Sequence, residues 1–560
     1  MSAHLRICIL QLNPLVGDVQ HNLSQIRRAI EKDPRRADLY VTPELALVGY
    51  SPRDLLSLPE LLAAEAAALE ELSHLSEQHG VGILVGHTET RSGPGKPLHN
   101  AATLFDTGLC LGRIRKRRMP YYDIFEEERF FESYEGEEQR PLVFRGAKLG
   151  IFICEDAWNE VRRYGKNDAG FSPYAELLDK QLVGSDLLVN LSASPYAIGK
   201  ISRRHETFAL HAQTHAAPLI FASCVGAQDE IVFDGGCFAT DAEGRIVARA
   251  ARFVEAELIV EFSPNARRLR GLGAENLPSE VGEWERVRQA LTLGISDYVR
   301  KTGFKKVVLG MSGGIDSALV AALACEALGP ENVLGLSLPS RFNSSETKND
   351  ARSLCKKLGM EFRELSIEAL LGSASATLAV KESGLTYENL QSRSRGLLLM
   401  TVSAQESRLL LSTGNKSELA MGYATLYGDM CGALAPIADL YKSEVFGLCY
   451  WMQLRGEIFP RSILERAPSA ELALGQKDQD SLPDYAVLDT VLADLIENQN
   501  LNREANQKFL SSCSNHTFER LTRVFHAMEY KRFQAPPLLK VHARSFGSAW
   551  RMPLAKGVLR

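Results

Sequence analysis

The sequence has few of the features that mark disulfide-rich, metal-cluster or membrane-spanning proteins. Only 10 of its 560 residues are cysteine, and no two of them form a Cys-x-x-Cys pair. This pattern argues against structural zinc, iron–sulfur clusters, thioredoxin-type redox chemistry and a disulfide framework. No apolar run reaches the ~20 residues that a membrane-spanning helix needs, and the first residues lack the regions of a signal peptide. We therefore expect a soluble cytoplasmic protein.

The sequence also lacks a large excess of charge of either sign. Its 64 Lys and Arg residues oppose 69 Asp and Glu residues, which gives a formal net charge of −5. This balance provides no overall attraction to nucleic acid or to anionic membranes, so we expect neither as a partner. Apolar residues make up 45% of the chain, a value typical of globular proteins, and the length allows about three domains or two large ones.

The first part of the chain reads as a layered α/β fold. Short apolar strands alternate with loops or amphipathic helices from Leu5 to about Glu261, and the Ala-, Leu- and Glu-rich segment Glu60–His79 predicts a helix. The predicted strands cover residues 5–10, 37–42, 82–86, 101–105, 149–154, 186–191 and 218–224. The Gly-, Pro- and charge-rich stretch that follows predicts a linker over residues 263–283. We thus expect one domain over residues 1–262 and a second over 284–560.

The second part of the chain begins with a helical pattern and continues as a βαβ unit. Apolar residues at helical spacing from Trp284 to Tyr298 predict a helix that ends at Gly303. A strand over 307–309, a Gly-rich turn, an apolar helix over 318–328 and a strand over 333–338 follow. This order predicts a doubly wound parallel sheet.

In the first part, three predicted strands are followed by a residue that can take part in catalysis. Glu44 lies in VTPELAL, Lys116 in RKRRMPYYDIFEEERFF and Cys154 in LGIFICEDAW. A cysteine at such a position becomes a nucleophile when a cation lowers the thiol pKa and a carboxylate takes the proton. Each residue alone is more typical of a buried small side chain or a solvated charge. Only the combination indicates an active site.

These three segments together resemble the Glu-Lys-Cys sites of the nitrilase (carbon–nitrogen hydrolase) superfamily. The resemblance extends from Leu5 to about Phe262 and implies an αββα sandwich. It implies that Glu44 is the general base, that Lys116 stabilises the oxyanion and that Cys154 is the nucleophile. Glu127 matches a further family carboxylate near this triad. The residues that the resemblance places at a glutamine substrate are Tyr122, Ser194, Lys200, Glu127 and Glu155.

In the second part, the turn GMSGGIDSALV has the composition of a phosphate-binding loop. Its glycines let the backbone fold tightly around an anion, and the helix that begins near Ser317 points free N–H groups toward the same place. Ser312 and Ser317 add hydroxyl donors, and Asp316 can bind Mg²⁺ directly or through water. The string is not a Walker A loop. The alternative is an ordinary strand–helix turn with an N-cap.

The string S-G-G-x-D-S resembles the pyrophosphate loop of N-type ATP pyrophosphatases, which adenylate a substrate. The segments YENLQSRSRG, LSTGNKSELAMGYATLYGDM and APIADLYKSEV resemble the NAD synthetase family, and RAPSAEL at 466–472 matches a substrate-covering loop of that family. The resemblance implies ATP binding by Gly310, Met311, Ser312, Gly313, Gly314, Ile315, Asp316, Ser317, Arg393 and Thr413. It implies contacts to deamido-NAD by Asn389, Glu418, Asp429 and Lys540, and it implies Mg²⁺ binding by Asp316 and Glu418.

An amidase joined to an adenylating domain resembles the family of glutamine-dependent NAD synthetases. The resemblance implies that ammonia from glutamine converts an adenylated deamido-NAD to NAD, with ammonia channelling between the sites and a homo-oligomeric state. Two alternatives stay open: a glutamine-dependent adenylating amidotransferase for another carboxylic acid, and a nitrilase-fold scaffold that senses nucleotides. The stretch 160–174 is interpreted as an insertion with no assigned role.

Overall fold

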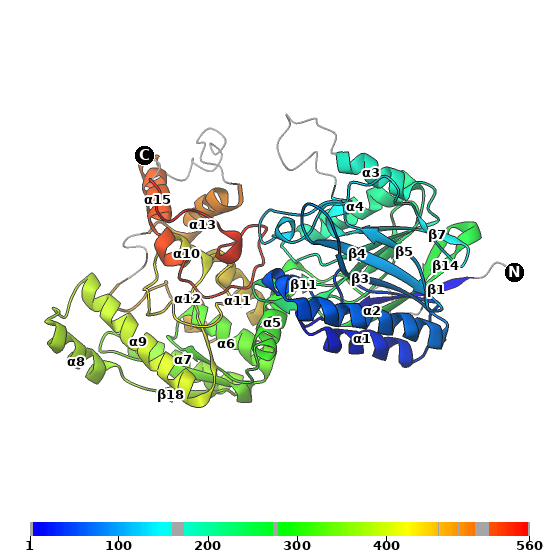
Figure 1. Ribbon diagram of the computed structural model, residues 1–560. Helices are drawn as coiled ribbons and strands as arrows, with labels where there is room; N and C mark the ends of the chain where they lie inside the picture. The colour runs from blue at the N-terminus through cyan, green and yellow to red at the C-terminus, as the bar shows by residue number, and fades with distance from the viewer. Residues whose placement is uncertain are drawn as a thin grey trace. The chain divides into compact units, whose positions relative to one another are not determined.

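The computed structural model describes residues 4–158, 173–272, 278–456, 458–473, 475–476, 478, 482–498 and 515–557. The chain folds into two compact units (Figure 1). One unit contains residues 1–228 and 232–281, and the other contains residues 229–231 and 282–560. The division in the chain falls within the segment that we expected to link two domains.

The first sheet of the first unit has seven strands in the order β15-β14-β1-β2-β3-β4-β5. Strands β1, β2 and β3 run parallel, and all other neighbouring pairs are antiparallel. The strands are β1 (Leu5–Gln11), β2 (Leu39–Val41), β3 (Gly82–Thr90), β4 (Leu98–Asp106), β5 (Leu109–Arg115), β14 (Ala256–Ser263) and β15 (Arg268–Gly271).

The second sheet of this unit has six strands in the order β13-β12-β9-β8-β7-β6. Its central strands β7, β8 and β9 are parallel. The strands are β6 (Leu142–Phe144), β7 (Ala147–Ile153), β8 (Leu187–Ser192), β9 (Leu219–Ser223), β12 (Phe238–Thr240) and β13 (Ile246–Arg249), and a separate ribbon consists of β10 (Val225–Gln228) and β11 (Ile231–Asp234).

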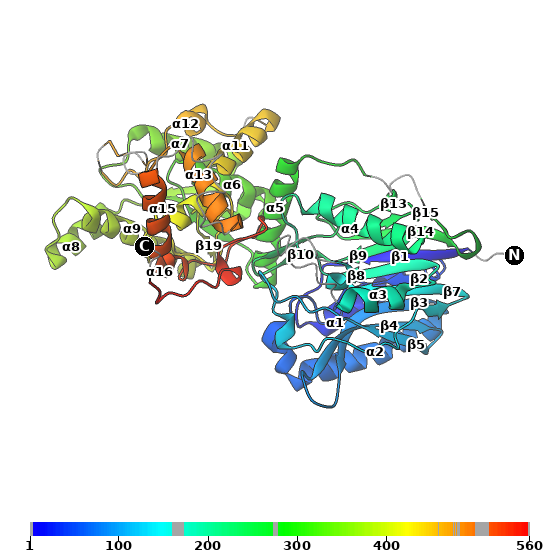
Figure 2. The ribbon, with the colours of Figure 1, turned by 90° about the horizontal axis from the view of Figure 1, so that it is seen from above.

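Apolar side chains of both sheets meet in one core, which contains Ile7 and Leu84 from the first sheet and Ile151 and Val189 from the second. Helices α1 (Val19–Glu31) and α2 (Pro59–His79) pack along the first sheet, whereas α3 (Pro173–Leu182) and α4 (Lys200–His215) pack along the second (Figure 2). Strands buried on both faces need nearly continuous apolar sequence, which is what β1, β7 and β8 have. The predicted αββα sandwich is confirmed.

The second unit contains a four-stranded, fully parallel sheet in the order β18-β17-β16-β19. Its strands are β16 (Val307–Gly310), β17 (Val333–Ser337), β18 (Glu361–Glu364) and β19 (Leu409–Leu411). Its helices are α5 (Glu283–Lys301), α6 (Ile315–Leu328), α7 (Ser345–Leu358), α8 (Glu368–Leu378), α9 (Leu385–Glu406), α10 (Lys416–Met421), α11 (Lys442–Gly456), α12 (Arg461–Glu465), α13 (Tyr485–Ala493), α15 (Asn515–Ala527) and α16 (Glu529–Arg532).

The order of these strands determines where a ligand is expected. β17 and β18 lie to one side of β16, while β19 lies to the other, so the order reverses between β16 and β19. In open α/β sheets, ligands bind outside the carboxyl ends of the strands at this reversal. Helix α6, which starts there, is buried almost all round because its sequence is nearly uniformly apolar. The predicted doubly wound parallel sheet is confirmed.

Three sequence expectations concern the remaining segments. Part of the predicted linker is instead strand β15, which pairs with β14 in the first sheet. Most of the predicted insertion at 160–174 lies outside the described residues. In the portion of the chain that the structure describes, no helix has the length and apolar character needed to cross a membrane.

Candidate active sites

A lysine of the first unit is buried between two carboxylates. Lys116 follows β5, and its side chain has no exposed surface. Its ammonium donates a hydrogen bond of 2.7 Å to Glu44 Oε1 and one of 2.7 Å to Glu127 Oε2. Glu44 follows β2, and Glu127 begins the 3₁₀ helix η2 (Glu127–Arg129). Three segments that are far apart in the sequence therefore place one lysine and two carboxyl groups in a buried site.

Both carboxylates are held in place by further donors. Asn100 Nδ2 donates to Glu44 Oε1 at 2.8 Å and to Glu127 Oε2 at 3.3 Å. The Tyr50 hydroxyl donates to Glu127 Oε1 at 2.8 Å, and the Ala193 amide donates to Glu44 Oε2 at 2.9 Å. Every oxygen of the pair thus has a partner, as buried carboxylates require. Sequence reasoning did not identify Tyr50 or Asn100, because neither lies in a segment with a catalytic pattern.

The third predicted triad member, Cys154, begins the 3₁₀ helix η3 (Cys154–Ala157) directly after β7. Its φ of 40° lies in the left-handed region, which is uncommon for residues other than glycine and is also adopted at several turns and helix ends of this chain. Burial raises the pKa of the Cys154 thiol well above its usual value, and Glu44 adds to the rise while Lys116 opposes it. The thiol is therefore neutral at rest and needs a base to become a nucleophile.

The charge state of Lys116 suits a group that stabilises an anion. Burial disfavours its charge, but Glu127 and Glu44 outweigh that effect and raise the pKa of Lys116 well above its usual value. Burial raises the pKa of Glu127 to about 7, with Lys116 opposing the rise. An ammonium that keeps its charge in a buried site is a strong stabiliser of a developing oxyanion.

The residues predicted to contact glutamine form two groups around this site. The Tyr122 hydroxyl donates to the two oxygens of Glu155 at 3.1 and 3.0 Å. The Lys200 ammonium donates to the Pro195 carbonyl at 3.0 Å, and burial lowers the pKa of Lys200 to about 7. The Ser194 hydroxyl accepts a bond of 3.2 Å from Arg204 on α4. Glu127, in contrast, lies against Lys116, and the glutamine contacts of all these residues stay predictions.

In the second unit, the loop from Gly310 to Gly314 joins β16 to α6. Gly313 has a φ of +83°, and a Cβ there would lie 2.2 Å from the Thr347 carbonyl oxygen, so only glycine fits. The Ser312 hydroxyl accepts from the Gly314 amide at 3.1 Å and lies 3.1 Å from the Ser317 hydroxyl. The loop thus leads directly into the first turn of α6, and the free N–H groups of this turn favour a bound anion.

A second lysine between two carboxylates lies next to this loop. The Lys442 ammonium pairs with Asp316 Oδ2 and, at 3.3 Å, with Glu418 Oε1. Asn415 donates to Asp316 Oδ1 at 2.8 Å and forms a reciprocal N-terminal cap with Glu418 on α10. Burial raises the pKa of Glu418 to about 8, while Lys442 opposes the rise. The structure brings the two predicted metal ligands together, and Lys442, which sequence reasoning did not select, joins them.

Asp316 and Glu418 fit Mg²⁺ as part of a shared shell. Among the residues that the structure describes, no three His, Cys, Asp or Glu side chains form a metal cluster. Mg²⁺ in nucleotide sites is commonly held by one or two carboxylates, with phosphate oxygens and water as the other ligands. Two carboxylates beside a phosphate-binding loop match that donor set.

Two residues predicted to contact deamido-NAD are linked through Thr425. The Thr425 hydroxyl donates to Asn389 Oδ1 at 3.1 Å, and the Thr425 amide donates to Asp429 Oδ1 at 2.6 Å. Ser392, one turn after Asn389 on α9, also donates to Asp429. Burial raises the pKa of Asp429. One helix and one loop therefore present an amide and a carboxylate side by side.

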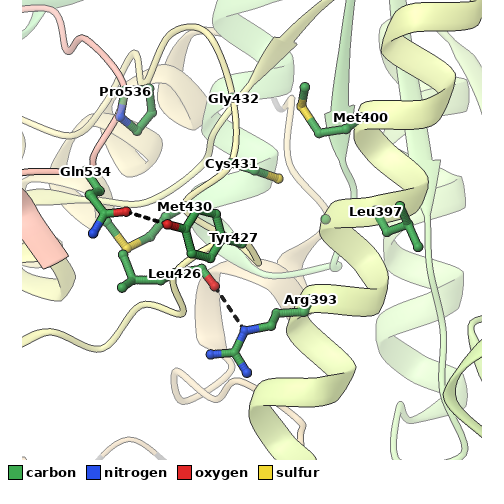
Figure 3. Close-up of a pocket in the computed structure, with 11 residues that line it drawn as sticks. Arg393, Leu397, Met400, Leu426, Tyr427, Met430, Cys431, Gly432, Gln534 and Pro536 are labelled. Carbon is green, nitrogen blue, oxygen red and sulfur yellow. Dashed lines mark hydrogen bonds between the residues drawn. The ribbon is translucent and has the colours of Figure 1, made fainter. Parts of the chain in front are cut away.

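Arg393, on the same helix, lines a cavity of about 580 Å³. Its guanidinium donates to the Leu426 carbonyl at 3.2 Å, and the Tyr427 hydroxyl donates to Gln534 (Figure 3). Thr413 lies in the loop after β19, and the Lys540 ammonium donates to the carbonyls of His542 and Ala543. The ligand contacts of Arg393, Thr413 and Lys540 stay predictions, since the structure gives only their places in the fold.

The predicted substrate-covering loop, 466–472, contacts the loop Gly310–Gly314, which is predicted to bind phosphate. Arg466 donates to the Gly313 carbonyl at 3.1 Å and pairs with Asp350 on α7. Glu471 accepts a bond of 2.9 Å from the Thr347 hydroxyl. Sequence reasoning identified the loop but none of these contacts, because they join segments more than 100 residues apart.

Comparisons with known proteins agree with this geometry. The carbon–nitrogen hydrolase family model matches residues 6–270, and the NAD synthase model matches residues 287–535. A glutamine-dependent NAD(+) synthetase of a Synechocystis strain is 42% identical, and one of Thermotoga maritima is 38% identical; each alignment covers 98% of both chains. The glutamine-dependent NAD+ synthetase of Acinetobacter baumannii, solved with ADP, superposes with a TM-score of 0.75 at 30% identity over 100% of this chain and 99% of that one.

These similarities confirm both resemblances that the sequence motifs suggested, the nitrilase-like one and the NAD synthetase-like one. They also cover the two sites described above, the buried Glu-Lys-Cys set and the phosphate-binding loop. Since the relatives match over nearly their full length, the chain belongs to the family of the glutamine-dependent NAD(+) synthetases.

Proposed function

We propose that this protein makes NAD from deamido-NAD, using ATP to activate the carboxylate and glutamine as the source of the amide nitrogen. The products besides NAD are AMP, pyrophosphate and glutamate. The observation that carries the proposal is the occurrence in one chain of a buried Glu-Lys-Cys set and of a phosphate-binding loop beside Asp316 and Glu418. Full-length similarity to synthetases named for this reaction supports it.

The first unit hydrolyses glutamine. The neutral Cys154 thiol transfers its proton to Glu44 as the sulfur attacks the side-chain amide carbon of glutamine. The Lys116 ammonium stabilises the oxyanion, and protonated Glu44 returns the proton to the amide nitrogen, so that ammonia leaves and a thioester remains. Water then attacks the thioester carbon while Glu44 takes a proton from it. Glu44 passes this proton to the Cys154 sulfur as the thioester C–S bond breaks, and glutamate leaves. The residues that hold the glutamine are Tyr122, Glu155, Ser194 and Lys200.

The second unit activates and amidates the acid. The phosphates of ATP bind at the loop Gly310–Ser317, with Arg393 and Thr413 as further contacts, and a carboxylate oxygen of deamido-NAD attacks the α-phosphorus so that pyrophosphate leaves. Ammonia then attacks the carbonyl carbon of this mixed anhydride, and AMP leaves. Asn389, Asp429 and Lys540 hold deamido-NAD. Asp316 and Glu418 would hold Mg²⁺, which when bound would neutralise part of the charge of the ATP phosphates.

The joining of the two activities has a chemical reason. Ammonia in neutral water is mostly ammonium, which is not a nucleophile, so transfer that avoids bulk water keeps it reactive. We include channelling of ammonia, a homo-oligomeric state and a cytoplasmic location in the proposal, on the basis of the family resemblance. Channelling predicts that glutamine supports NAD formation before free ammonia accumulates in the solution.

The direct test is an assay of the purified protein with deamido-NAD, ATP, Mg²⁺ and either glutamine or ammonium. We expect NAD and pyrophosphate in equal amounts from both nitrogen sources. A protein that makes no NAD from either would refute the proposal. Release of pyrophosphate with a different carboxylic acid, in a panel that includes deamido-NAD, would favour the alternative amidotransferase. Turnover of glutamine excludes a nucleotide sensor without catalysis.

A further inference from the structure

Asp156 lies two residues after the nucleophile and is buried, and no step described above uses it. Its Oδ1 accepts the amide N–H of Arg117 at 3.0 Å and that of Arg118 at 2.9 Å. Its Oδ2 accepts the amide N–H of Ile153 at 3.1 Å. One carboxylate therefore connects the backbone that directly follows Lys116 to the backbone that directly precedes the nucleophile.

A second link joins the same two segments. Gln181 on α3 accepts a hydrogen bond of 2.7 Å from Arg117 Nε and donates one of 2.6 Å to the Ile151 carbonyl on β7. The Arg117 guanidinium also donates to the carbonyls of Tyr134 and Gly136, at 3.1 and 2.9 Å. The segment that carries Lys116 is thus linked to β7 at Ile151, through Gln181, and at Ile153, through Asp156.

These links matter because the two catalytic residues belong to different sheets. Lys116 follows β5 in the seven-stranded sheet, and Cys154 follows β7 in the six-stranded sheet. The sheets are held together by an apolar core, and apolar contact is non-directional. Close packing limits both the spacing and the sliding of the sheets, and the bond from the Ala193 amide to Glu44 also joins them. The hydrogen bonds of Asp156 and Gln181 add a directional constraint at the segments that carry Lys116 and Cys154.

We propose that Asp156, supported by Gln181, is a positioning residue for glutamine hydrolysis, which fixes the Lys116 ammonium relative to the Cys154 sulfur. The inference rests on the proposed glutaminase activity of the first unit. The role of Asp156 is separate from glutamine binding, since its two oxygens accept hydrogen bonds from three backbone amides and are not directed at a substrate. Displacement of a reacting group by about 1 Å costs roughly 100-fold in rate.

The substitution Asp156→Asn removes one of the two connections while preserving volume. An amide keeps one accepting oxygen, but its NH₂ group faces an N–H donor on the other side, so either the Arg117–Arg118 side or the Ile153 side is lost. Burial raises the pKa of Asp156 to about 6, so replacement of the carboxylate by a neutral group relieves a desolvation cost that offsets part of the lost hydrogen bonding.

The test compares glutamine hydrolysis and ammonium-driven NAD formation in the full-length variants. For Asp156→Asn we expect kcat for glutamine hydrolysis to fall about 100-fold with KM unchanged, and ammonium-driven synthesis to be unaffected. Asp186→Asn is the matched control, because Asp186 accepts the Lys148 amide at 2.9 Å at the opposite end of β7. This control should leave both activities unchanged.

Gln181→Met removes the second link without a change of charge and should lower kcat less, again with KM unchanged. If Asp156→Asn does not fold, the kcat of Gln181→Met tests the positioning role in its place. The rate of alkylation of Cys154 by iodoacetamide against pH provides a readout that does not depend on glutamine, and its profile should shift in Asp156→Asn but not in Asp186→Asn.

An unchanged kcat and alkylation profile in a folded Asp156→Asn variant would overturn the inference, as would an equal loss of activity in the Asp186 control. A wild-type protein that alkylates normally but never hydrolyses glutamine would instead refute the proposed function. In that case a shifted alkylation profile in Asp156→Asn would still support the positioning role.

Discussion

Both units contain a lysine between two carboxylates, but the two arrangements differ in their access to solvent. Lys116, Glu44 and Glu127 have side-chain exposures of 0%, 0% and 3%. Lys442 is 3% exposed, whereas its partners Asp316 and Glu418 are 17% and 21% exposed. The side chains of the first set are nearly sealed from solvent, and the carboxylates of the second set stay partly accessible.

This difference corresponds to two kinds of chemistry. In the proposed glutamine hydrolysis, the Lys116 ammonium of the sealed set keeps its charge while Glu44 takes up and returns a proton, which suits stabilisation of a transient oxyanion. In the accessible set, the partly exposed carboxylates suit the Mg²⁺ binding that we propose there. Under the proposed function, we therefore expect the same residue types to act as fixed electrostatics in one unit and as ligands in the other.

The largest expected effect is the loss of one unit's activity with the other unit's activity unchanged. Replacement of Cys154 by alanine removes the nucleophile, so glutamine-driven NAD formation should vanish while ammonium-driven formation stays at the wild-type rate. Product formation with each nitrogen source measures this. If the folded variant loses both activities, the division of labour between the units is wrong.

The reverse pattern is expected for Asp316→Asn, which removes the charge but keeps the bond from Asn415. NAD formation should fall roughly 100-fold or more with either nitrogen source, because the carboxylate proposed to bind Mg²⁺ beside the ATP phosphates is lost. Glutamine hydrolysis measured without the other substrates should persist. Retention of NAD formation would show that Asp316 has no role in nucleotide activation.

The contrast in exposure predicts unequal effects of lysine removal on stability. Lys116→Met leaves two buried carboxylates without a counter-ion, a change that typically costs about 3–5 kcal/mol and here corresponds to a fall in melting midpoint of roughly 10 °C. Acidification should reduce the deficit, because Glu127 then takes up a proton. Lys442→Met should lower the midpoint less and mainly raise KM for ATP. Equal shifts in the two variants at pH 8 would contradict the distinction between sealed and accessible sites.

The smallest effect concerns a buried carboxylate outside both sites. Glu65 on α2 accepts a 3.0 Å bond from the Thr88 amide and a further bond from the Thr88 hydroxyl, and burial raises its pKa from 4.5 to about 7. A raised pKa means that the stabilisation of the folded state is complete below pH 4.5 and is lost as the pH rises through 7. Glu65→Gln should flatten this dependence and melt several degrees higher than the wild type at pH 8. Parallel melting curves for both proteins between pH 5 and pH 8 would show that Glu65 does not titrate in this range.

The sequence predicted the fold well because its signals are local. The strand patterns at Leu5–Leu10 and Leu149–Cys154 and the helix pattern at Glu60–His79 correspond to β1, β7 and α2. Apolar periodicity and helix propensity act over a few residues, so they can be interpreted without knowledge of the tertiary structure. The predicted linker was less accurate, since the charged segment Arg268–Gly271 still pairs as an edge strand.

Residues of the candidate sites that lie in a recognisable motif were predicted from the sequence. Their partners from distant parts of the chain were missed. Glu44, Lys116 and Asp316 stand at strand or helix ends with recognisable surroundings. Lys442 reaches Asp316 across 126 residues, and Asn100 reaches Glu44 across 56. Only the topology of the sheets brings such residues together, and no local pattern marks them.

The most direct test of the account is NAD formation from glutamine labelled with ¹⁵N at its side-chain amide, in the presence of deamido-NAD, ATP and Mg²⁺. The account predicts that wild-type protein places the label in the carboxamide of NAD and releases one AMP and one pyrophosphate per labelled molecule. A sample that hydrolyses the glutamine but forms no labelled NAD, or that forms none from ammonium either, would contradict it.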